Sequence, residues 1–289
     1  KLIESFQHPL ILIFRCWEGL EEWLYKEGFP YKHVIIDEGQ DFALLPSKEE
    51  GDRNVEIIDE LREAALQSGG TFYLFYDRNQ AIQGERNRTY ELPSYIADSD
   101  CRLTLYQNCR NTSAISQTSL TPLQLPQKRW SGSKVIDPWS VQVEKPVFHL
   151  LDDESLIVEA VNKVLDDLQA KDVTDIVLLT VGTMAYTALR DGLESLDEGA
   201  DKYWYYCYKR KRYRMTTAQR FKGLEATAII MVDLKPDSFA GKNGMVFYVG
   251  ASRAKLFLDF VAVIPEGEYK NVIQSVKETE PVRIGRAHV

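Results

Sequence analysis

The stretch from Lys32 to Phe42, KHVIIDEGQDF, constrains the fold of this chain more than any other part of the sequence. Its short apolar run ends abruptly in two adjacent carboxylates, Asp37 and Glu38. Such a run is typical of a buried strand in a parallel sheet, and these sheets bind ligands beyond the carboxyl ends of their strands. Carboxylates at that edge can hold a magnesium ion and position a water molecule. Taken alone, the stretch fits either a magnesium site or a solvated acidic turn after a strand.

Short apolar segments alternate with amphipathic segments along most of the remaining chain. Strands are expected at residues 34–36, 71–76, 147–151, 175–180, 226–233 and 256–264, and helices at residues 54–66, 152–170, 183–196 and 244–255. This alternation predicts an α/β protein whose parallel sheets are covered by helices. The polar stretch 84–100 is expected to connect a first lobe, residues 1–100, to a second lobe, residues 101–289.

The composition fits a protein of the cytoplasm. With 289 residues, the chain has room for about two domains of about 100–200 residues each. It lacks both the run of ~18 apolar residues that a transmembrane helix needs and the layout of a secretory signal. Its scattered cysteines form no Cys-x-x-Cys pair and suit a reducing compartment. We therefore expect a cytoplasmic protein without a membrane partner. Because the chain starts without Met, we also expect it to be a piece of a longer protein.

Aromatic and cationic side chains alternate between residues 202 and 214, KYWYYCYKRKRYR. Aromatic rings stack on bases and cations neutralise phosphates, so these cations are candidates for the flank of a nucleic-acid path. They include Lys209, Arg210, Lys211 and Arg212. The same alternation also describes a hairpin with one buried face. The net charge of −8 argues against a surface that coats nucleic acid everywhere, but binding follows local charge, so both interpretations stay open.

Five short motifs, in this order along the chain, resemble those of the superfamily 1 helicases in the UvrD/Rep-like branch. They extend from Val34 to Lys255 and read IIDEGQDF, FYDRNQAIQ, LYQNCRNTSAI, MTTAQRFKGLEATAII and FYVGASRAK. The resemblance implies a P-loop NTPase fold of two RecA-like lobes, of which the first is incomplete here. It also implies an ATP-dependent helicase or translocase that acts on single-stranded or partly duplex DNA and uses ATP with Mg²⁺.

For the first lobe, the resemblance implies a magnesium and nucleotide site. Asp37 matches the magnesium ligand, and Glu38 matches the base that orients the attacking water. Gln40 belongs to the same nucleotide-binding motif, and Gln80 matches the residue that senses the terminal phosphate. The family usually has Gly-Asp where this chain has Tyr76-Asp77.

For the second lobe, the resemblance implies two arginines that contact the phosphates, and Arg110 and Arg253 match them. It also implies that Gly223 lies near the phosphates and that Glu225 holds the ribose. Thr216, in the same motif, is a further candidate for binding nucleic acid. An arginine at a transferring phosphate contributes about 10³–10⁵ in rate. With the arginines on one lobe and the carboxylates on the other, hydrolysis is expected to depend on closure of the two lobes.

One family motif is missing from the sequence. A phosphate loop, Gly-x-x-x-x-Gly-Lys-[Ser/Thr], should precede the first acidic motif, but the one Gly-Lys pair, Gly241-Lys242, is followed by Asn. In one explanation, the chain is the C-terminal part of a longer helicase, and alone it hydrolyses little or no ATP. In the other, the nucleotide site has decayed and the chain is a nucleic-acid-binding or scaffolding module.

Overall fold

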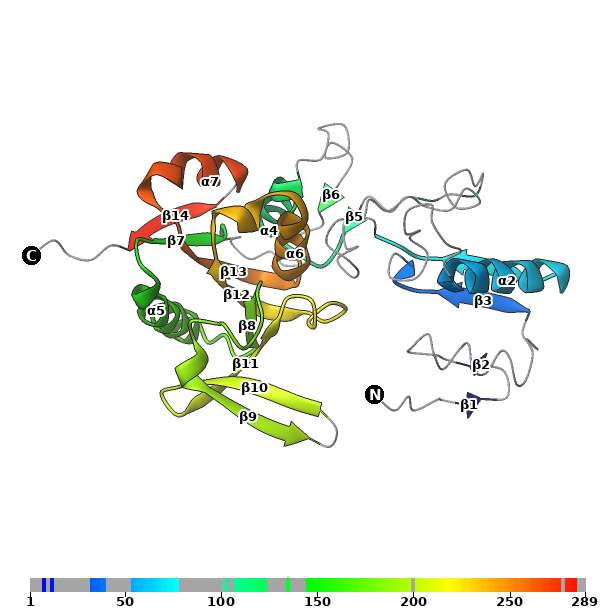
Figure 1. Ribbon diagram of the computed structural model, residues 1–289, viewed down its shortest axis with the longest axis horizontal. Helices are drawn as coiled ribbons and strands as arrows, with labels where there is room; N and C mark the ends of the chain where they lie inside the picture. The colour runs from blue at the N-terminus through cyan, green and yellow to red at the C-terminus, as the bar shows by residue number, and fades with distance from the viewer. Residues whose placement is uncertain are drawn as a thin grey trace, which may run out of the picture. The chain divides into compact units, whose positions relative to one another are not determined.

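The structure is a computed structural model that describes most of the second half of the chain and parts of the first half. The described residues are 7–8, 11–12, 32–39, 53–77, 101, 103, 107–123, 134–135, 144–198, 201–276 and 279–284. The chain divides into two compact units, Lys1–Leu103 and Thr104–Val289, where the sequence prediction divided it after residue 100. Figure 1 labels the helices and strands of both units.

In the first unit, two parallel strands pack against one helix. Apolar residues of the helix, Leu61 and Ala65, are buried against Val34 of the first strand. The second strand can approach because Gly70 precedes it: a β-carbon there would lie 1.5 Å from the carbonyl oxygen of Lys32. The elements are β3 (His33–Ile36), β4 (Thr71–Leu74) and α2 (Arg53–Gln67), beside an antiparallel pair, β1 (Gln7–His8) and β2 (Ile11–Leu12).

The second unit is built on an eight-stranded sheet in the order β14-β7-β13-β12-β8-β11-β10-β9. From β14 to β11 all neighbours are parallel, whereas β10 and β9 are added antiparallel at one edge. The strands are β7 (Val147–Leu151), β8 (Ile176–Thr180), β9 (Leu193–Glu198), β10 (Asp201–Tyr208), β11 (Lys211–Thr217), β12 (Ala226–Leu234), β13 (Ala254–Val263) and β14 (Glu280–Ile284). A small parallel pair, β5 (Gln107–Asn108) and β6 (Lys134–Val135), lies outside this sheet.

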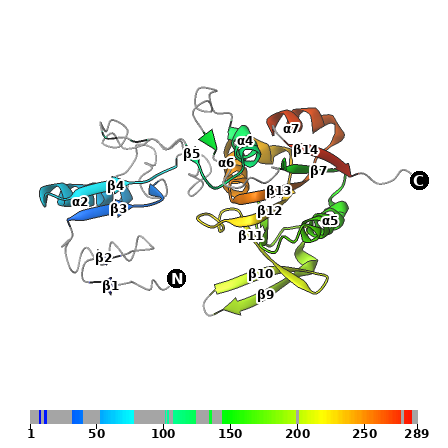
Figure 2. The same ribbon diagram turned by 180° about the vertical axis from the view of Figure 1, so that it is seen from behind.

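Helices cover both faces of the large sheet (Figures 1 and 2). One face carries α4 (Ser113–Leu120), α6 (Gly241–Ala251) and α7 (Tyr269–Ser275), and the other carries α5 (Ile157–Ala170). Strand β8 shows why both faces need cover: Val177 and Leu179 enter one core, and Ile176 and Leu178 enter the other. The predicted fold class, α/β with a parallel sheet, is therefore confirmed.

Short 3₁₀ helices link the larger elements. They are η3 (Thr121–Leu123), η5 (Glu154–Leu156), η6 (Arg190–Gly192), η7 (Pro236–Phe239) and η8 (Glu266–Glu268). Among the described helices, none combines the length and the apolar character that crossing a membrane requires.

The helix predicted over residues 183–196 is wrong. The structure has turns, η6 and then β9, which pairs with β10 from Leu193 opposite Tyr206. The spacing of Leu189, Leu193 and Leu196 is helical, but Gly192 separates them and lies against the Tyr206 ring, where a β-carbon would come within 2.6 Å. Pairing with the neighbouring strand decides the structure of this segment.

The helix predicted over residues 244–255 is correct only in its first part. Helix α6 ends at Ala251, and Lys255 already belongs to β13. The amide side chain of Asn111 donates hydrogen bonds to the carbonyl oxygens of Ser252 and Ala254. These bonds fix the backbone where α6 ends and β13 begins.

Candidate nucleotide site

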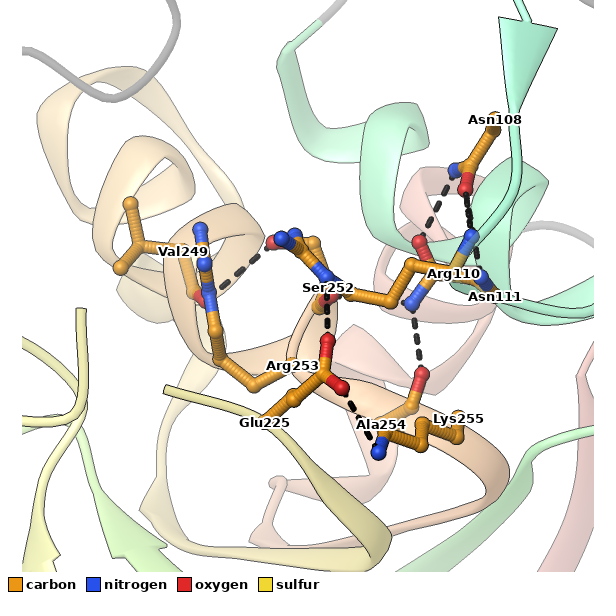
Figure 3. A network of polar contacts seen from close by, with 9 residues as sticks. All are labelled: Asn108, Arg110, Asn111, Glu225, Val249, Ser252, Arg253, Ala254 and Lys255. Atoms are coloured by element: carbon orange, nitrogen blue, oxygen red, sulfur yellow. Dashed lines mark hydrogen bonds and ion pairs between the residues drawn. The ribbon is translucent and has the colours of Figure 1, made fainter. Parts of the chain in front are cut away.

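Three charged side chains from distant parts of the sequence meet at the amino-terminal ends of β12 and β13. Nε of Arg110 donates a hydrogen bond of 3.1 Å to Oε2 of Glu225, and Nζ of Lys255 lies 2.6 Å from Oε1 of Glu225. Figure 3 shows the Glu225 carboxylate between the two cations. We call Arg110, Glu225 and Lys255 the ionic cluster. It brings together two residues that the sequence assigned to the nucleotide.

A rigid turn positions Arg110. The Asn108 side-chain oxygen accepts hydrogen bonds from the backbone N–H groups of Arg110 and Asn111, at 3.0 and 3.2 Å. Asn111 is 2% exposed, and its side chain bonds the segment that opens β13. Thr112 then caps α4, accepting the N–H of Ile115 at 3.4 Å. Arg110 therefore projects from a turn that is fixed on both sides (Figure 3).

A glycine turn positions Glu225. Gly223 has φ +82°, a left-handed conformation that favours glycine, and the N–H of Leu224 bonds the carbonyl of Phe221 at 3.0 Å. The N–H of Ala226 bonds the carbonyl of Arg253 at 3.1 Å, which joins the start of β12 to the start of β13. This pairing brings the Lys-Gly-Leu-Glu segment and the Arg-Ala-Lys segment of the sequence side by side.

The two cations keep Glu225 ionised. The hydrogen bond from Lys255 is the largest cause that lowers the pKa of Glu225; partial burial raises it, and the bond from Arg110 lowers it further. The carboxylate is still 43% exposed, so a ligand can reach it. An ionised, exposed carboxylate can accept hydrogen bonds from the hydroxyls of a sugar.

Arg253 differs from the other predicted site residues that the structure describes because it is buried. It is 1% exposed, and its Nε donates a 3.0 Å hydrogen bond to the carbonyl of Val249. The accessible cation of this motif is instead Lys255, whose side chain is 40% exposed. The sequence prediction missed Lys255, although it stands in the same motif, and it missed the supporting Asn108. The position of Lys255, two residues after the matched arginine, could have indicated that it is a candidate site residue.

In the first unit, Asp37 and Glu38 directly follow β3. The N–H of Glu38 bonds Oδ1 of Asp37 at 2.9 Å, and Glu38 has a left-handed φ of +54°. The turn is tied to the next strand because the N–H of Gly39 bonds the carbonyl of Phe75 at 2.8 Å. Asp77 follows β4, so the polar ends of two parallel strands lie at one edge.

This acidic turn can supply part of the ligand set of a magnesium ion. Mg²⁺ is usually held by one or two carboxylates together with water and substrate phosphates, and the exposed Asp37 supplies one such carboxylate. Within the described part of the chain, no group of three or more His, Cys, Asp or Glu side chains is arranged to hold a metal ion. Gln40 and Gln80 lie outside the described residues.

The predicted nucleic-acid cations lie on the hairpin of β10 and β11. Lys209 and Arg210 form its turn, with φ of +47° and +62°. Nζ of Lys209 lies 2.7 Å from Asp166 of α5, and Nζ of Lys211 donates to Gln169 of α5 at 3.0 Å. These two lysines are thus engaged on the α5 side.

The other two predicted residues differ in their surroundings. Arg212 forms an ion pair of 3.2 Å with Glu194 of β9. Thr216 is half-buried on β11, opposite Leu179 of β8.

No protein-family model and no curated protein matches this sequence. Among solved structures, the chain is similar to the C-terminal domain of a possible DNA helicase from Lactobacillus plantarum, with 15% identity and a TM-score of 0.43 over 60% of this chain and 98% of that one. It is also similar to the large terminase of a thermophilic bacteriophage, with 10% identity and a TM-score of 0.32, over 48% of this chain and 40% of that one. The same phage terminase in complex with ADP gives 10% identity and a TM-score of 0.20, over 65% and 41%.

Proposed function

We propose that this chain is part of a helicase-type NTPase and that the ionic cluster binds a nucleotide. The observation that supports the proposal is the meeting of Arg110, Glu225 and Lys255, which come from three separate motifs. In the superfamily 1 helicases that these motifs resemble, the matching segments hold the ribose and the phosphates. The substrate is then ATP, with DNA as the partner along which the protein moves.

A nucleotide can displace the contacts that the cluster makes on its own. The side chains of Arg110, Glu225 and Lys255 are 39%, 43% and 40% exposed, and exposed ion pairs contribute only about 0–1 kcal/mol. Arginine forms stronger, bidentate hydrogen bonds with phosphate. A triphosphate can therefore draw Arg110 away from Glu225 and leave the carboxylate to accept the ribose hydroxyls.

In the proposed reaction, the residues of the first unit have roles of their own. Asp37 would hold Mg²⁺, which neutralises charge on the terminal phosphates, and Glu38 would orient the attacking water. Arg110 would stabilise the negative charge that develops on the transferring phosphoryl group.

A second candidate function is a nucleic-acid-binding or scaffolding module that no longer uses ATP. The sequence favours it in one respect, since it contains no Gly-x-x-x-x-Gly-Lys-[Ser/Thr] loop to hold phosphates. The two candidate functions differ in one testable property, which is whether the ionic cluster binds a nucleotide.

Titration of the ¹⁵N-labelled chain with magnesium ATP tests the proposal. We expect the backbone amide signals of Arg110, Gly223, Glu225 and Lys255 to shift as nucleotide is added. Replacing Glu225→Gln removes a charged hydrogen-bond acceptor, a loss of about 1.5–3 kcal/mol. Binding should therefore weaken by about ten- to a hundredfold.

The matched control is Glu154→Gln, which also removes an exposed carboxylate paired with a lysine, Lys235 at 2.9 Å. It should bind nucleotide like the unaltered chain. If millimolar magnesium ATP leaves the four amide signals unmoved, the cluster is not a nucleotide site and the second candidate function is favoured.

A further inference from the structure

We propose that the face of β9, β10 and β11 that points away from α5 binds single-stranded nucleic acid, with Tyr203 and Tyr205 stacking on bases and Arg214 binding phosphate. This inference rests on the proposed function for nucleic acid as the partner. We call Tyr203, Tyr205, Arg214 and Thr216 the open face.

Alternation along the strands separates the open face from the α5 side. Tyr206 and Tyr208 point to α5, where their hydroxyls donate hydrogen bonds to Asn162 at 2.9 Å and Asp166 at 3.0 Å. Neighbouring residues on a strand point to opposite sides, so Tyr203 and Tyr205 lie on the other face. Their rings are half-buried, whereas Tyr206 is only 3% exposed.

The facing strand supplies the cation. Arg214 lies opposite Tyr205 on β11, between the buried residues Tyr213 and Met215, whose side chains enter the α5 core. Arg214 and Thr216 therefore point to the same side as the two tyrosines. Among the helices of the second unit that the structure describes, none is drawn over this side of β9 and β10 (Figures 1 and 2).

Glu194, which lies opposite Tyr205 on the same face, pairs with Arg212, and this leaves Arg214 without an ion pair to a described carboxylate. Its guanidinium lies 5.3 Å from the ring centre of Tyr203 and 5.8 Å from that of Phe221, and it forms no ion pair with a described residue. By contrast, Lys209 is paired with Asp166 and Arg212 with Glu194. The contacts with the two rings do not use up the N–H donors of the guanidinium, so these N–H groups can bond a phosphate.

This combination of groups fits single-stranded nucleic acid better than an apolar protein surface. Bases stack on tyrosine rings with about 1–3 kcal/mol each, and they do so with little dependence on sequence. An arginine without a carboxylate partner would be costly to bury against apolar side chains but is favourable beside phosphates. We therefore expect binding with little base preference.

The open face is connected to the ionic cluster by one short segment of chain. Residues 218–225 run from the end of β11 to the start of β12 and include both Phe221, which touches Arg214, and Glu225. Phe221 is 2% exposed and is fixed in the core. Nucleic acid bound to Arg214 would thus act on this segment indirectly, through the packing of Arg214 on Phe221.

The test is the binding of a fluorescent oligothymidylate to the 289-residue chain, measured by anisotropy without nucleotide. Tyr205→Leu should weaken binding by about 5- to 150-fold, the equivalent of about 1–3 kcal/mol per stacked base. Tyr205→Phe, which keeps the ring, should bind like the unaltered chain. Arg214→Gln should reduce the slope of log affinity against log salt by about 0.7, because one phosphate contact is lost.

The matched control is Lys211→Gln, which removes a cation from the α5 side of the same hairpin and should change affinity less than about twofold. Ultraviolet cross-linking of the unaltered chain to a 4-thiothymidine oligonucleotide adds a test that needs no variant, and we expect links at Tyr203 or Tyr205. Cross-links confined to residues 209–211, or equal binding by the Leu and Phe variants, would overturn the inference.

The outcomes also separate this inference from the proposed function. If magnesium ATP shifts the Glu225 amide but oligothymidylate does not bind through the open face, only the inference fails. If the oligonucleotide binds through Tyr205 and Arg214 but nucleotide leaves the ionic cluster unmoved, the nucleotide site fails and the inference stands.

Discussion

At the scale of single residues, the pKa of Glu225 depends on the positions of its two cationic partners. Its carboxylate is held by Lys255 and Arg110, and both bonds favour the charged form. A carboxyl group whose pKa is lowered by folding stabilises the protein above its unfolded pKa, and that stabilisation is lost as pH falls through the folded pKa. Because Glu225 is 43% exposed, solvent screening limits the contribution to the stability of the fold.

We predict that the Glu225 carboxyl titrates below its ordinary value of 4.5. Lys255→Gln should raise this midpoint more than Arg110→Gln does, since the lysine makes the largest lowering contribution. The side-chain carboxyl carbon signal, followed by nuclear magnetic resonance between about pH 2 and 7, measures the midpoint. A midpoint at or above 4.5 in the unaltered chain would contradict the geometry of the cluster.

Gly223 gives a second prediction at this scale. Its φ of +82° is costly for any residue with a β-carbon, so Gly223→Ala should destabilise the fold by about 1–2 kcal/mol. Urea denaturation measures the change. Gly267→Ala is the matched control, because Gly267 is not among the residues of positive φ and a β-carbon there meets nothing within 4 Å. Equal stability of the two variants would show that the turn relaxes without cost.

At the scale of elements, a buried polar pair joins β7 to β13. Nε2 of His149 lies 2.9 Å from Oδ1 of Asp259, and the two residues are 5% and 8% exposed. The other ring nitrogen of His149, Nδ1, is buried without a hydrogen-bond partner in the described structure. The pair lines a cavity of about 270 Å³ beneath the second half of α5.

We predict that His149→Phe destabilises the protein by about 3–5 kcal/mol, because it leaves the Asp259 carboxylate buried without its partner. Adding Asp259→Leu should recover most of the loss, since an apolar pair of similar size removes the unpaired charge. Chemical denaturation of both variants measures the difference. A double variant that is no more stable than His149→Phe would mean that the lost stability comes from packing and not from the charge.

The elements also show how far the sequence predicts this fold. Buried strands such as β8 and β12 could be predicted because an apolar run identifies them without reference to the strands beside them. The segment of β9 was predicted as a helix because its leucines have helical spacing, and only the pairing with β10 decides against it. Strand β14 was not predicted, because its short EPVRI sequence has no marked apolar run and it forms by pairing with β7.

At the scale of the whole molecule, the sequence predicted Arg110 and Glu225 as neighbours of one ligand through motif order alone. It could not predict that Lys255 is the exposed cation and Arg253 the buried one, because burial depends on how α6 ends against Asn111. It also could not assign the aromatic residues of β10 to two faces before the position of α5 was known. The roles of Gln40 and Gln80 stay predictions.

The sheet order has a consequence for how the protein is made. Strand β7 pairs with β13 and β14, which the ribosome synthesises only near the end of this sequence. Until those strands emerge, the apolar segment Val147–Leu151 and its helix α5 have no completed sheet to pack against. Such late, long-range pairing slows folding and leaves apolar surface exposed to aggregation. The second unit is thus expected to depend on chaperones during translation more than a protein of similar size with local strand pairing.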